Sequence, residues 1–368
     1  MSRTSRSTRL GFASALATVT LVLSPALPAA ASDSPTTWHV QAGNVDDLTF
    51  RSIAQVETTF YNARTFVHPG DDVVFTAVDG HTITFNPIRL PGVPTFAYAD
   101  PNFPGGPTGN TLTFANRSGG GLLNSGAIAQ PGLGPPNTPS SFTLHIGADA
   151  AGVSSDDEVG TTYQFFCMFH RDMTGFITVL PRTARLPFTE LQNQARAQGA
   201  MQADLARGSR ALREAGSDVE NAQIAAGLGV ASVQGAGADL ILRFAPATIK
   251  VNVGHSVTWT NRDPNEAHTV TFGAERPGPP GAPPGFLPYG SNVINSETDQ
   301  ANSGWLLSQG LIDYVNASSL FPPGFVITRQ VTYTFTKPGT YHYFCALHDQ
   351  FGMTGTVIVE NADDQTNG

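Results

Sequence analysis

Two groups of potential metal ligands occur in the same order in this sequence. In each group a lone His is followed, after a long interval, by Cys-x-x-His and then by Met. The first set is His81, Cys167, His170 and Met173, and the second is His268, Cys345, His348 and Met353. Two imidazoles, one thiolate and a weak axial thioether form a mononuclear blue-copper site, because soft sulfur and borderline nitrogen together suit both oxidation states of copper. The pattern therefore predicts two copper ions per chain, one in each set.

The only two cysteines of the chain are Cys167 and Cys345, at equivalent places in the two sets. The simplest interpretation is two reduced thiolates, each held by its own metal. A secreted protein would normally pair two cysteines, so an intrachain disulfide is the alternative. That alternative leaves both ordered ligand sets unexplained. A free buried Cys that acts only as a small apolar residue does not account for the His three residues after each Cys.

The N-terminus has the pattern of a secretory signal peptide. Arg3, Arg6 and Arg9 precede an apolar run at residues 10–23, and three alanines at 29–31 provide a small-residue cleavage site. We expect residues 1–31 to be removed and the product to be secreted. No Cys follows the apolar run to carry a lipid, and no second long apolar segment could span a membrane.

The net charge of the full chain is −9, and loss of the three signal-peptide arginines lowers it to −12. This sign opposes binding to nucleic acid or to anionic membranes and favours basic protein partners.

An internal repeat divides the chain. Residues 60–70 align with 244–254 without a gap, 81–85 with 268–272, and 163–167 with 341–345. Both copies then continue into Met-Thr-Gly and a closing strand. A duplicated unit is the economical explanation. We expect one domain at 37–182, a connector at 183–238 and a second domain at 239–361.

Within each copy the sequence favours an all-β fold. Short segments rich in β-branched and aromatic residues, bounded by turn residues, are typical of Greek-key β-sandwiches. A turn at 337–340 leads into the strand that ends on Cys345, so His348 and Met353 should lie on the following loop. Both copies also carry long Gly/Pro-rich stretches, at 87–139 and 273–323. We favour surface decoration for these stretches over a cover near the metal.

The connector breaks the β pattern. It is rich in Ala, Gln, Glu, Arg and Leu and predicts one or two helices with a narrow apolar stripe. That stripe is Leu191, Leu205, Leu212 and Val219. Three glycines weaken any single long helix, and the heptads are too few for a coiled coil. We expect a partly helical connector that packs against or between the sandwiches.

The ligand motifs resemble those of a known family. Residues 341–357, with Cys-x2-His-x4-Met, resemble the copper-ligand strand and loop of plastocyanins, and the shorter Cys-x2-His-x2-Met at 167–173 resembles amicyanin. The chain thus resembles a tandem two-domain cupredoxin of the plastocyanin/azurin type. The resemblance implies that His81 and His268 are the upstream ligands, Cys167 and Cys345 the thiolates, and Met173 and Met353 the axial thioethers.

The resemblance also implies that His170 and His348 lie near the surface, where electrons enter and leave through a ring of apolar residues. Phe169 and Leu347 are candidates for that ring, and ordinary packing of the loop is the alternative role for both. One departure is that Thr82 and Thr269 stand where the family usually has Asn. A Thr hydroxyl can still hydrogen-bond across to the Cys loop.

Enzymatic copper chemistry is not expected. Multicopper oxidases need His-x-His pairs, and they and copper nitrite reductases need a His beside the Cys; the sequence has neither. Nucleophile-elbow, phosphate-loop and zinc-protease motifs are absent as well. The expected function is transfer of single electrons between protein partners. Copper sequestration or delivery is the alternative, and an adhesion or scaffold module with vestigial sites is a third possibility.

Overall fold

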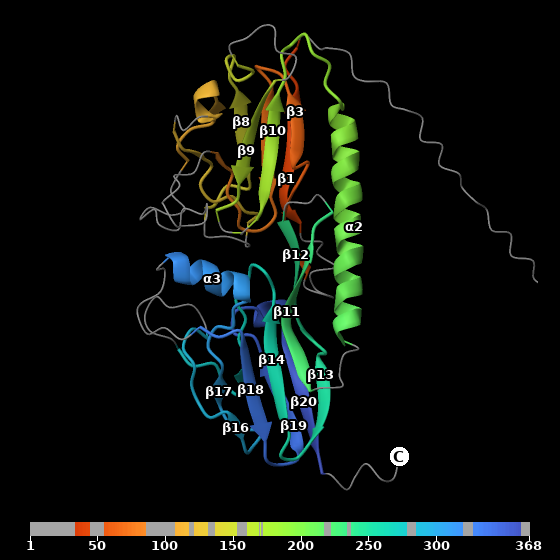
Figure 1. The fold of residues 1–368 in the computed structure, drawn as a ribbon, viewed down its shortest axis with the longest axis vertical. Helices are drawn as coiled ribbons and strands as arrows, with labels where there is room; N and C mark the ends of the chain where they lie inside the picture. Colours follow the sequence, from red (N-terminus) through yellow and green to blue (C-terminus); the bar gives the residue numbers. More distant parts are fainter. Residues whose placement is uncertain are drawn as a thin grey trace, which may run out of the picture.

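The structure is a computed structural model that describes residues 34–44, 55–85, 107–117, 121–131, 137–152, 160–168, 170, 172–216, 222–233, 237–277, 285–318 and 327–361. Two β-sandwiches lie end to end, and one long helix runs beside both (Figure 1). The expected all-β class, with two Greek-key cupredoxin sandwiches and a partly helical connector, is confirmed. The predicted signal peptide lies outside the described residues.

The first sandwich contains ten strands and one short 3-10 helix. They are β1 (Thr37–Asn44), β2 (Gln55–Tyr61), β3 (Arg64–Val67), β4 (Asp72–Ala77), β5 (Thr84–Phe85), β6 (Thr111–Leu112), η1 (Phe114–Arg117), β7 (Leu123–Asn124), β8 (Ser141–Ile146), β9 (Thr161–Phe166) and β10 (Thr174–Val179). Helix α2 (Glu190–Gly216) follows this sandwich.

The second sandwich repeats this order. It consists of β11 (Gln223–Ala231), β12 (Gly237–Ala245), β13 (Thr248–Asn252), β14 (Ser256–Arg262), β15 (Thr271–Phe272), β16 (Val293–Ile294), β17 (Ala301–Asn302), α3 (Gln309–Ser318), β18 (Gln330–Phe335), β19 (Gly339–Phe344), η2 (Asp349–Phe351) and β20 (Thr354–Glu360). Strand β11 therefore lies inside the stretch expected to be connector, whose helical part is α2. The proposed domain limits remain a prediction.

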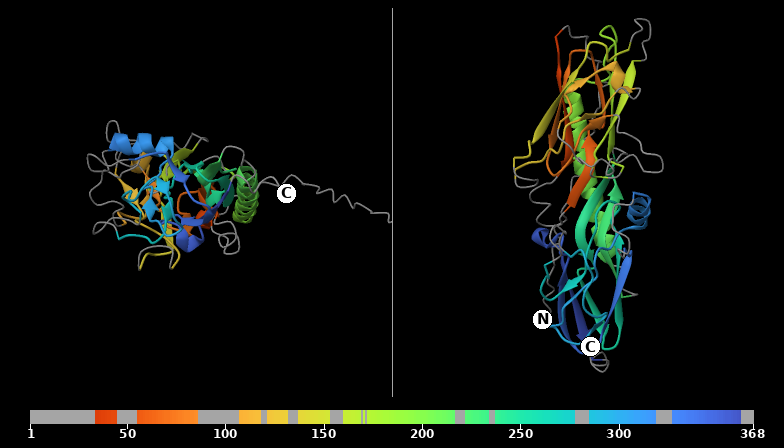
Figure 2. Two further views of the ribbon diagram at one scale, coloured as in Figure 1. Left: turned by 90° about the horizontal axis from the view of Figure 1, so that it is seen from below. Right: turned by 90° about the vertical axis from the view of Figure 1, so that its left-hand side faces the viewer.

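One sheet is shared by the two sandwiches. Its ten strands run β16-β18-β14-β11-β12-β2-β1-β4-β8-β6, and the antiparallel pair β12–β2 joins the two halves. Each half is covered by a separate five-stranded sheet, β3-β10-β9-β5-β7 or β13-β20-β19-β15-β17. The molecule is accordingly long and narrow (Figure 2). Continuous backbone hydrogen bonding across β12–β2 opposes independent motion of the two sandwiches.

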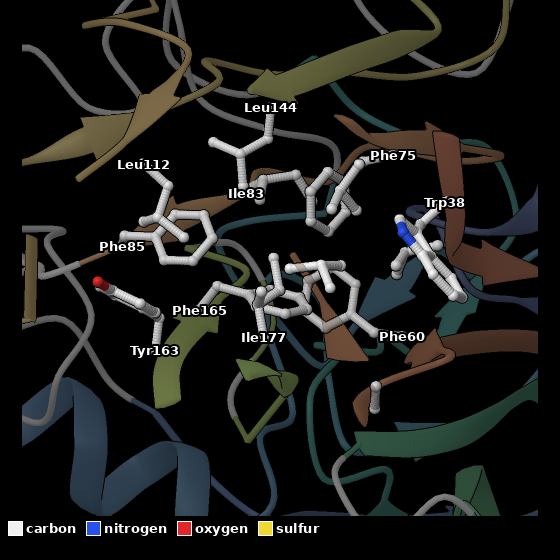
Figure 3. Packing of buried hydrophobic residues seen from close by; sticks show 14 of the residues in the cluster. Trp38, Phe60, Phe75, Ile83, Phe85, Leu112, Leu144, Tyr163, Phe165 and Ile177 are labelled. Atoms are coloured by element: carbon white, nitrogen blue, oxygen red, sulfur yellow. The ribbon is translucent and has the colours of Figure 1, made fainter. Parts of the chain in front are cut away.

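The core of the first sandwich lies around Phe165 of β9 (Figure 3). Its ring contacts Phe60, Phe75 and Phe85 at centroid distances of 4.8, 5.2 and 5.6 Å. In the second sandwich Tyr343 takes the same place, two residues before the Cys. Edge-on aromatic packing of this kind stabilises each core and holds the strand that ends on the thiolate.

Helix α2 begins with a capping box. The Thr189 hydroxyl accepts from Gln192 N–H, and the Gln192 side chain accepts from Thr189 N–H. The predicted apolar stripe is only partly the packing face: Leu212 packs against the cluster around Ile241, but Leu191 is 76% exposed and Val219 lies outside the described residues. The face that packs on the sheet consists of small and polar residues, Asn193, Ala197, Ala200, Asp204 and Gly208. Small side chains let the helix approach the sheet closely, which the apolar pattern could not reveal.

Asp204 fastens α2 across the junction of the sandwiches. Its carboxylate accepts hydrogen bonds from the Tyr61 hydroxyl of β2 at 3.1 Å, from the Ser232 hydroxyl at 2.6 Å and from Val233 N–H at 2.7 Å. Tyr61 belongs to the first sandwich and the other two donors follow β11 of the second. A fully buried carboxylate requires such partners, so Asp204 ties three elements together.

The second long Gly/Pro-rich stretch contains defined structure near the junction. Leu311 and Ile312 of α3 pack with Leu307, Ala267 and Ile327. Gly285 approaches the metal-site loop so closely that an added Cβ would lie 2.8 Å from the Thr269 side chain. This part of the stretch therefore packs against Thr269 and Ala346, the residues that follow the ligands His268 and Cys345. Within the described segments, no helix has both the length and the hydropathy to cross a membrane.

Candidate metal centres

The first ligand set is gathered at one end of its sandwich. The Cys167 sulfur lies 3.6 Å from His81 Nδ1 and 3.5 Å from His170 Nδ1, and the two Nδ1 atoms are 3.1 Å apart. Met173 is fully buried in the same core cluster as Cys167. The structure thus brings together the sulfur and both imidazoles of the first predicted set.

The second set has nearly the same geometry. The Cys345 sulfur lies 3.8 Å from His268 Nδ1 and 3.4 Å from His348 Nδ1, and the two Nδ1 atoms are 3.2 Å apart. Met353 is again buried in the cluster of its thiolate. Both cysteines are free, so the alternative of an intrachain disulfide is wrong.

These distances test whether a metal fits. Ligand atoms bonded to one ion at about 2.0–2.3 Å lie roughly 3–4 Å from one another, as the three atoms of each set do. Two imidazole nitrogens with one thiolate suit copper, and a buried thioether nearby is the usual weak fourth ligand. The residues therefore fit a type 1 copper ion.

Each Cys is positioned by the strand before it and by a backbone hydrogen bond to the Met that follows it. Cys167 N–H donates to Met173 O at 3.0 Å, and Cys345 N–H donates to Met353 O at 3.0 Å. The glycine of each Met-Thr-Gly is also required, because a Cβ at Gly175 or Gly355 would collide with the ring of Phe165 or Tyr343. The recurring Met-Thr-Gly thus closes the loop beneath the central aromatic residue.

The residues after the upstream histidines brace the Cys loops. The hydroxyl of Thr82 accepts from Met168 N–H at 2.8 Å, and that of Thr269 accepts from Ala346 N–H at 2.8 Å. The expectation that a Thr hydroxyl can hydrogen-bond across to the Cys loop is confirmed. Backbone N–H groups of the same two threonines point at the sulfurs at 3.4 Å. Hydrogen bonds to the thiolate tune the potential of such a site.

Behind each upstream imidazole lies a carboxylate. His81 Nε2 is 2.5 Å from Asp79, and His268 Nε2 is 3.2 Å from Asp263. Such contacts fix the tautomer, leaving Nδ1 free for a metal. These acidic residues were not singled out in the sequence, although Asp79 precedes His81 by only two positions.

The charges at these centres shift the protonation of the ligands. Burial alone would lower the pKa of His81, but the Asp79 carboxylate and the Cys167 sulfur together raise that pKa to about 10. The pKa of His268 is likewise raised to about 10, against the effect of burial, by its hydrogen bond to Asp263. Burial would raise the pKa of both cysteines, but the adjacent imidazoles hold the pKa of Cys167 and of Cys345 well below the ordinary value. The metal-binding thiolate form is therefore favoured.

Comparison with known proteins agrees with this geometry. Residues 230–360 match the model of the family described as copper binding proteins, plastocyanin/azurin family. Chloroplastic plastocyanin of Tetradesmus obliquus is 32% identical over 152 residues, which cover 41% of this chain and 81% of that protein. Plastocyanin of Scenedesmus fuscus is 27% identical over 119 residues, covering 32% of this chain and 88% of its own length. This chain belongs to the plastocyanin/azurin family.

Solved structures similar to the chain include an oxidised plastocyanin from Dryopteris crassirhizoma, with 19% identity, a TM-score of 0.20, and coverage of 38% of this chain and 99% of that one. A purple cupredoxin from Nitrosopumilus maritimus has 21% identity, a TM-score of 0.18, and coverage of 38% and 100%. The family assignment rests on the sequence relatives. The family is defined by copper binding and not by an enzymatic reaction, which agrees with the expectation for this chain.

As a member of the plastocyanin/azurin family, the chain departs from expectation at the loop imidazoles. His170 and His348 were expected near the surface, but both are buried, with side chains 10% and 9% exposed. Leu347 packs against the core of the second sandwich, and Phe169 lies outside the described residues. Both imidazoles are therefore less exposed than expected, and Glu266 of the second sandwich lies within 4.0 Å of each.

One carboxylate lies between the two loop imidazoles. Glu266 Oε1 is 3.8 Å from His170 Nε2, and Glu266 Oε2 is 4.0 Å from His348 Nε2. Burial raises the pKa of Glu266, while the neighbouring His348 and His170 oppose that rise. The two candidate copper centres of this plastocyanin-like chain thus face each other.

Proposed function

We propose that the chain is an exported electron carrier with two type 1 copper sites. His81, Cys167, His170 and Met173 would hold one ion, and His268, Cys345, His348 and Met353 the other. The observation that carries this proposal is the pair of buried His-Cys-His clusters with nearly equal interatomic distances. Copper would supply reversible one-electron chemistry at both places.

The protein's part in this chemistry is to keep each ligand set rigid. Threonine hydroxyls brace the Cys loops, carboxylates orient the upstream imidazoles, and aromatic rings hold the strands that end on the thiolates. A rigid set changes little when its charge changes, which favours electron transfer. The partners would be redox proteins, and export would follow from the N-terminal segment.

Copper sequestration or delivery is the alternative. A cargo site must release its metal, and accessible ligands make release easier. Here both cysteines and both upstream histidines are fully buried. This burial favours a permanent redox centre over a transfer site.

The test is copper content together with the visible absorption of copper-loaded protein, with and without ascorbate. Two coppers per chain and an intense thiolate band that bleaches on reduction are expected. Cys167→Ser and Cys345→Ser should each remove one copper and about half of the band. Colourless copper binding would instead support sequestration, and absence of copper binding would refute the proposal.

A further inference from the structure

The four imidazoles of the two centres share one arrangement. Each Nδ1 faces the sulfur of its own site, and each Nε2 faces a carboxylate. The upstream imidazoles have separate partners, Asp79 and Asp263, whereas the two loop imidazoles share Glu266. Glu266 is therefore the one described carboxylate that contacts histidines of both centres.

The segment that carries Glu266 is longer than its counterpart in the first domain. His268 follows Trp259 of β14 by nine residues, whereas His81 follows the equivalent Phe75 of β4 by six. The additional length falls between Asp263 and His268, where Glu266 lies. The duplication thus left the two halves unequal at the point where the two centres meet.

Hydrogen bonds hold this longer loop in place. The Asp263 carboxylate accepts from Asn265 N–H and Glu266 N–H at 2.9 Å, and Asn261 Nδ2 donates to Glu266 O at 2.9 Å. Asn265 Nδ2 also donates to the Thr58 hydroxyl of β2 at 3.0 Å. This contact reaches the first sandwich, so the loop spans the junction. Asp263 also orients His268, which links the loop to the second centre.

The junction itself is firmly held. Strands β12 and β2 pair directly, and Asp204 of α2 joins groups from both sides. The separations of 3.8 and 4.0 Å exceed hydrogen-bond length but suit ion pairing or a single bridging water. With metal–nitrogen bonds of about 2 Å, these contacts would place the two metals under about 20 Å apart.

We propose that Glu266 is a positioning residue shared by both metal centres, and that the contact His170–Glu266–His348 is an electron route between them inside the molecule. The proposal rests on the proposed function. In this step one electron would pass from the reduced to the oxidised one of the two metals that the His-Cys-His sets would hold, with no bond made and no proton moved. The first electron would come from an external one-electron protein donor.

The test measures electron exchange between the two centres in the fully copper-loaded chain. Met173→Gln serves as the background, because a changed axial ligand gives the first centre its own spectrum and potential. After rapid one-electron reduction by a small reductant, redistribution between the two bands is followed over time. Glu266→Ala removes the carboxylate, Glu266→Gln keeps its shape, and Glu360→Gln changes an exposed partner of Lys250 as the matched control.

We expect first-order exchange that is independent of protein concentration. It should slow at least tenfold in Glu266→Ala and less than threefold in Glu266→Gln, and it should not change in Glu360→Gln. Pulsed electron paramagnetic resonance of the oxidised protein should give the same copper–copper distance in all three variants. An unchanged distance shows that slower exchange comes from the missing carboxylate and not from a change in how the two sandwiches are joined.

An unchanged exchange rate in Glu266→Ala, exchange that depends on protein concentration, or a copper–copper distance well beyond about 20 Å would overturn the inference. These outcomes would leave two copper centres and the proposed function intact. Failure to bind two coppers would instead refute the proposed function before any exchange is measured.

Discussion

Substitution of Gly227 by Ala should damage the second metal centre selectively. Gly227 lies in a bulge of β11 with φ +71°, and an added Cβ would stand well under 3.0 Å from His268 Nε2. Because His268 is fully buried, its ring has little room to retreat without leaving Asp263 or the Cys345 sulfur. We therefore expect the imidazole to be displaced from its metal-binding position.

The cost has two parts, and a second glycine separates them. Left-handed backbone strain in a non-glycine residue is about 1–2 kcal/mol. Gly254→Ala carries that strain alone, since φ is +84° and an added Cβ meets no atom within 4 Å. In Gly227→Ala, overpacking against the His268 ring adds about 1–3 kcal/mol. The expected loss in free energy of unfolding is then about 3 kcal/mol for Gly227→Ala and about 1 kcal/mol for Gly254→Ala.

The assay uses a Cys167→Ser background, so that any thiolate band comes from the second centre. Copper content, band intensity and urea unfolding are measured for both glycine variants. Gly227→Ala should lose the band or most of its intensity, and Gly254→Ala should keep it. If Gly227→Ala keeps an unchanged band and loses no more stability than Gly254→Ala, the close approach of β11 to His268 is not what positions this ligand.

Three further predictions concern other parts of the chain. Thr82→Val should destabilise the copper-free protein by about 2 kcal/mol and speed copper loss to a chelator, because the buried Met168 N–H loses its acceptor. Thr82→Ser keeps a hydroxyl and should restore both the stability and the slow copper loss. Equal behaviour of the two variants would contradict this role of the hydroxyl. Asp204→Ala leaves three donors without their acceptor and should lower the free energy of unfolding by about 3 kcal/mol, while the thiolate bands stay unchanged. A loss below about 1 kcal/mol in urea unfolding would show that these bonds do not hold α2 in place. In copper-free protein the pKa of His81 is raised from an ordinary 6.5 to about 10. The stability that this shift contributes is fully present below pH 6.5 and is lost as the pH rises toward 10. Asp79→Asn should therefore lower the free energy of unfolding, measured with urea, more at pH 6 than at pH 10. Equal losses of stability at the two pH values would refute the pairing of His81 with Asp79.

Much of each sandwich could be predicted because its determinants are local. Alternating apolar residues and turn residues predict β-strands without reference to partners. The helix α2 was predicted, but of its packing face only Leu212 was. Helical patterns reveal a face through large apolar residues, and Leu191 is exposed while the buried Asp204 and Gly208 serve as the contact. Strand β11 escaped prediction because its glycines at 227 and 229 weaken a strand pattern that only pairing with β12 and β14 completes.

The sequence by itself determined which side chains could bind a metal and in what order, since Cys-x-x-His before Met places three ligands on one loop whatever surrounds it. It also predicted two copies of one unit. Only the tertiary structure decided that β12 pairs with β2, that the two loop imidazoles are buried, and that Glu266 lies between them. These features depend on contacts between residues far apart in the chain, such as His348 and Glu266 at 82 positions (348 − 266), for which a linear pattern carries no signature. The sequence therefore predicted two separate sites, and the fold turned them toward each other.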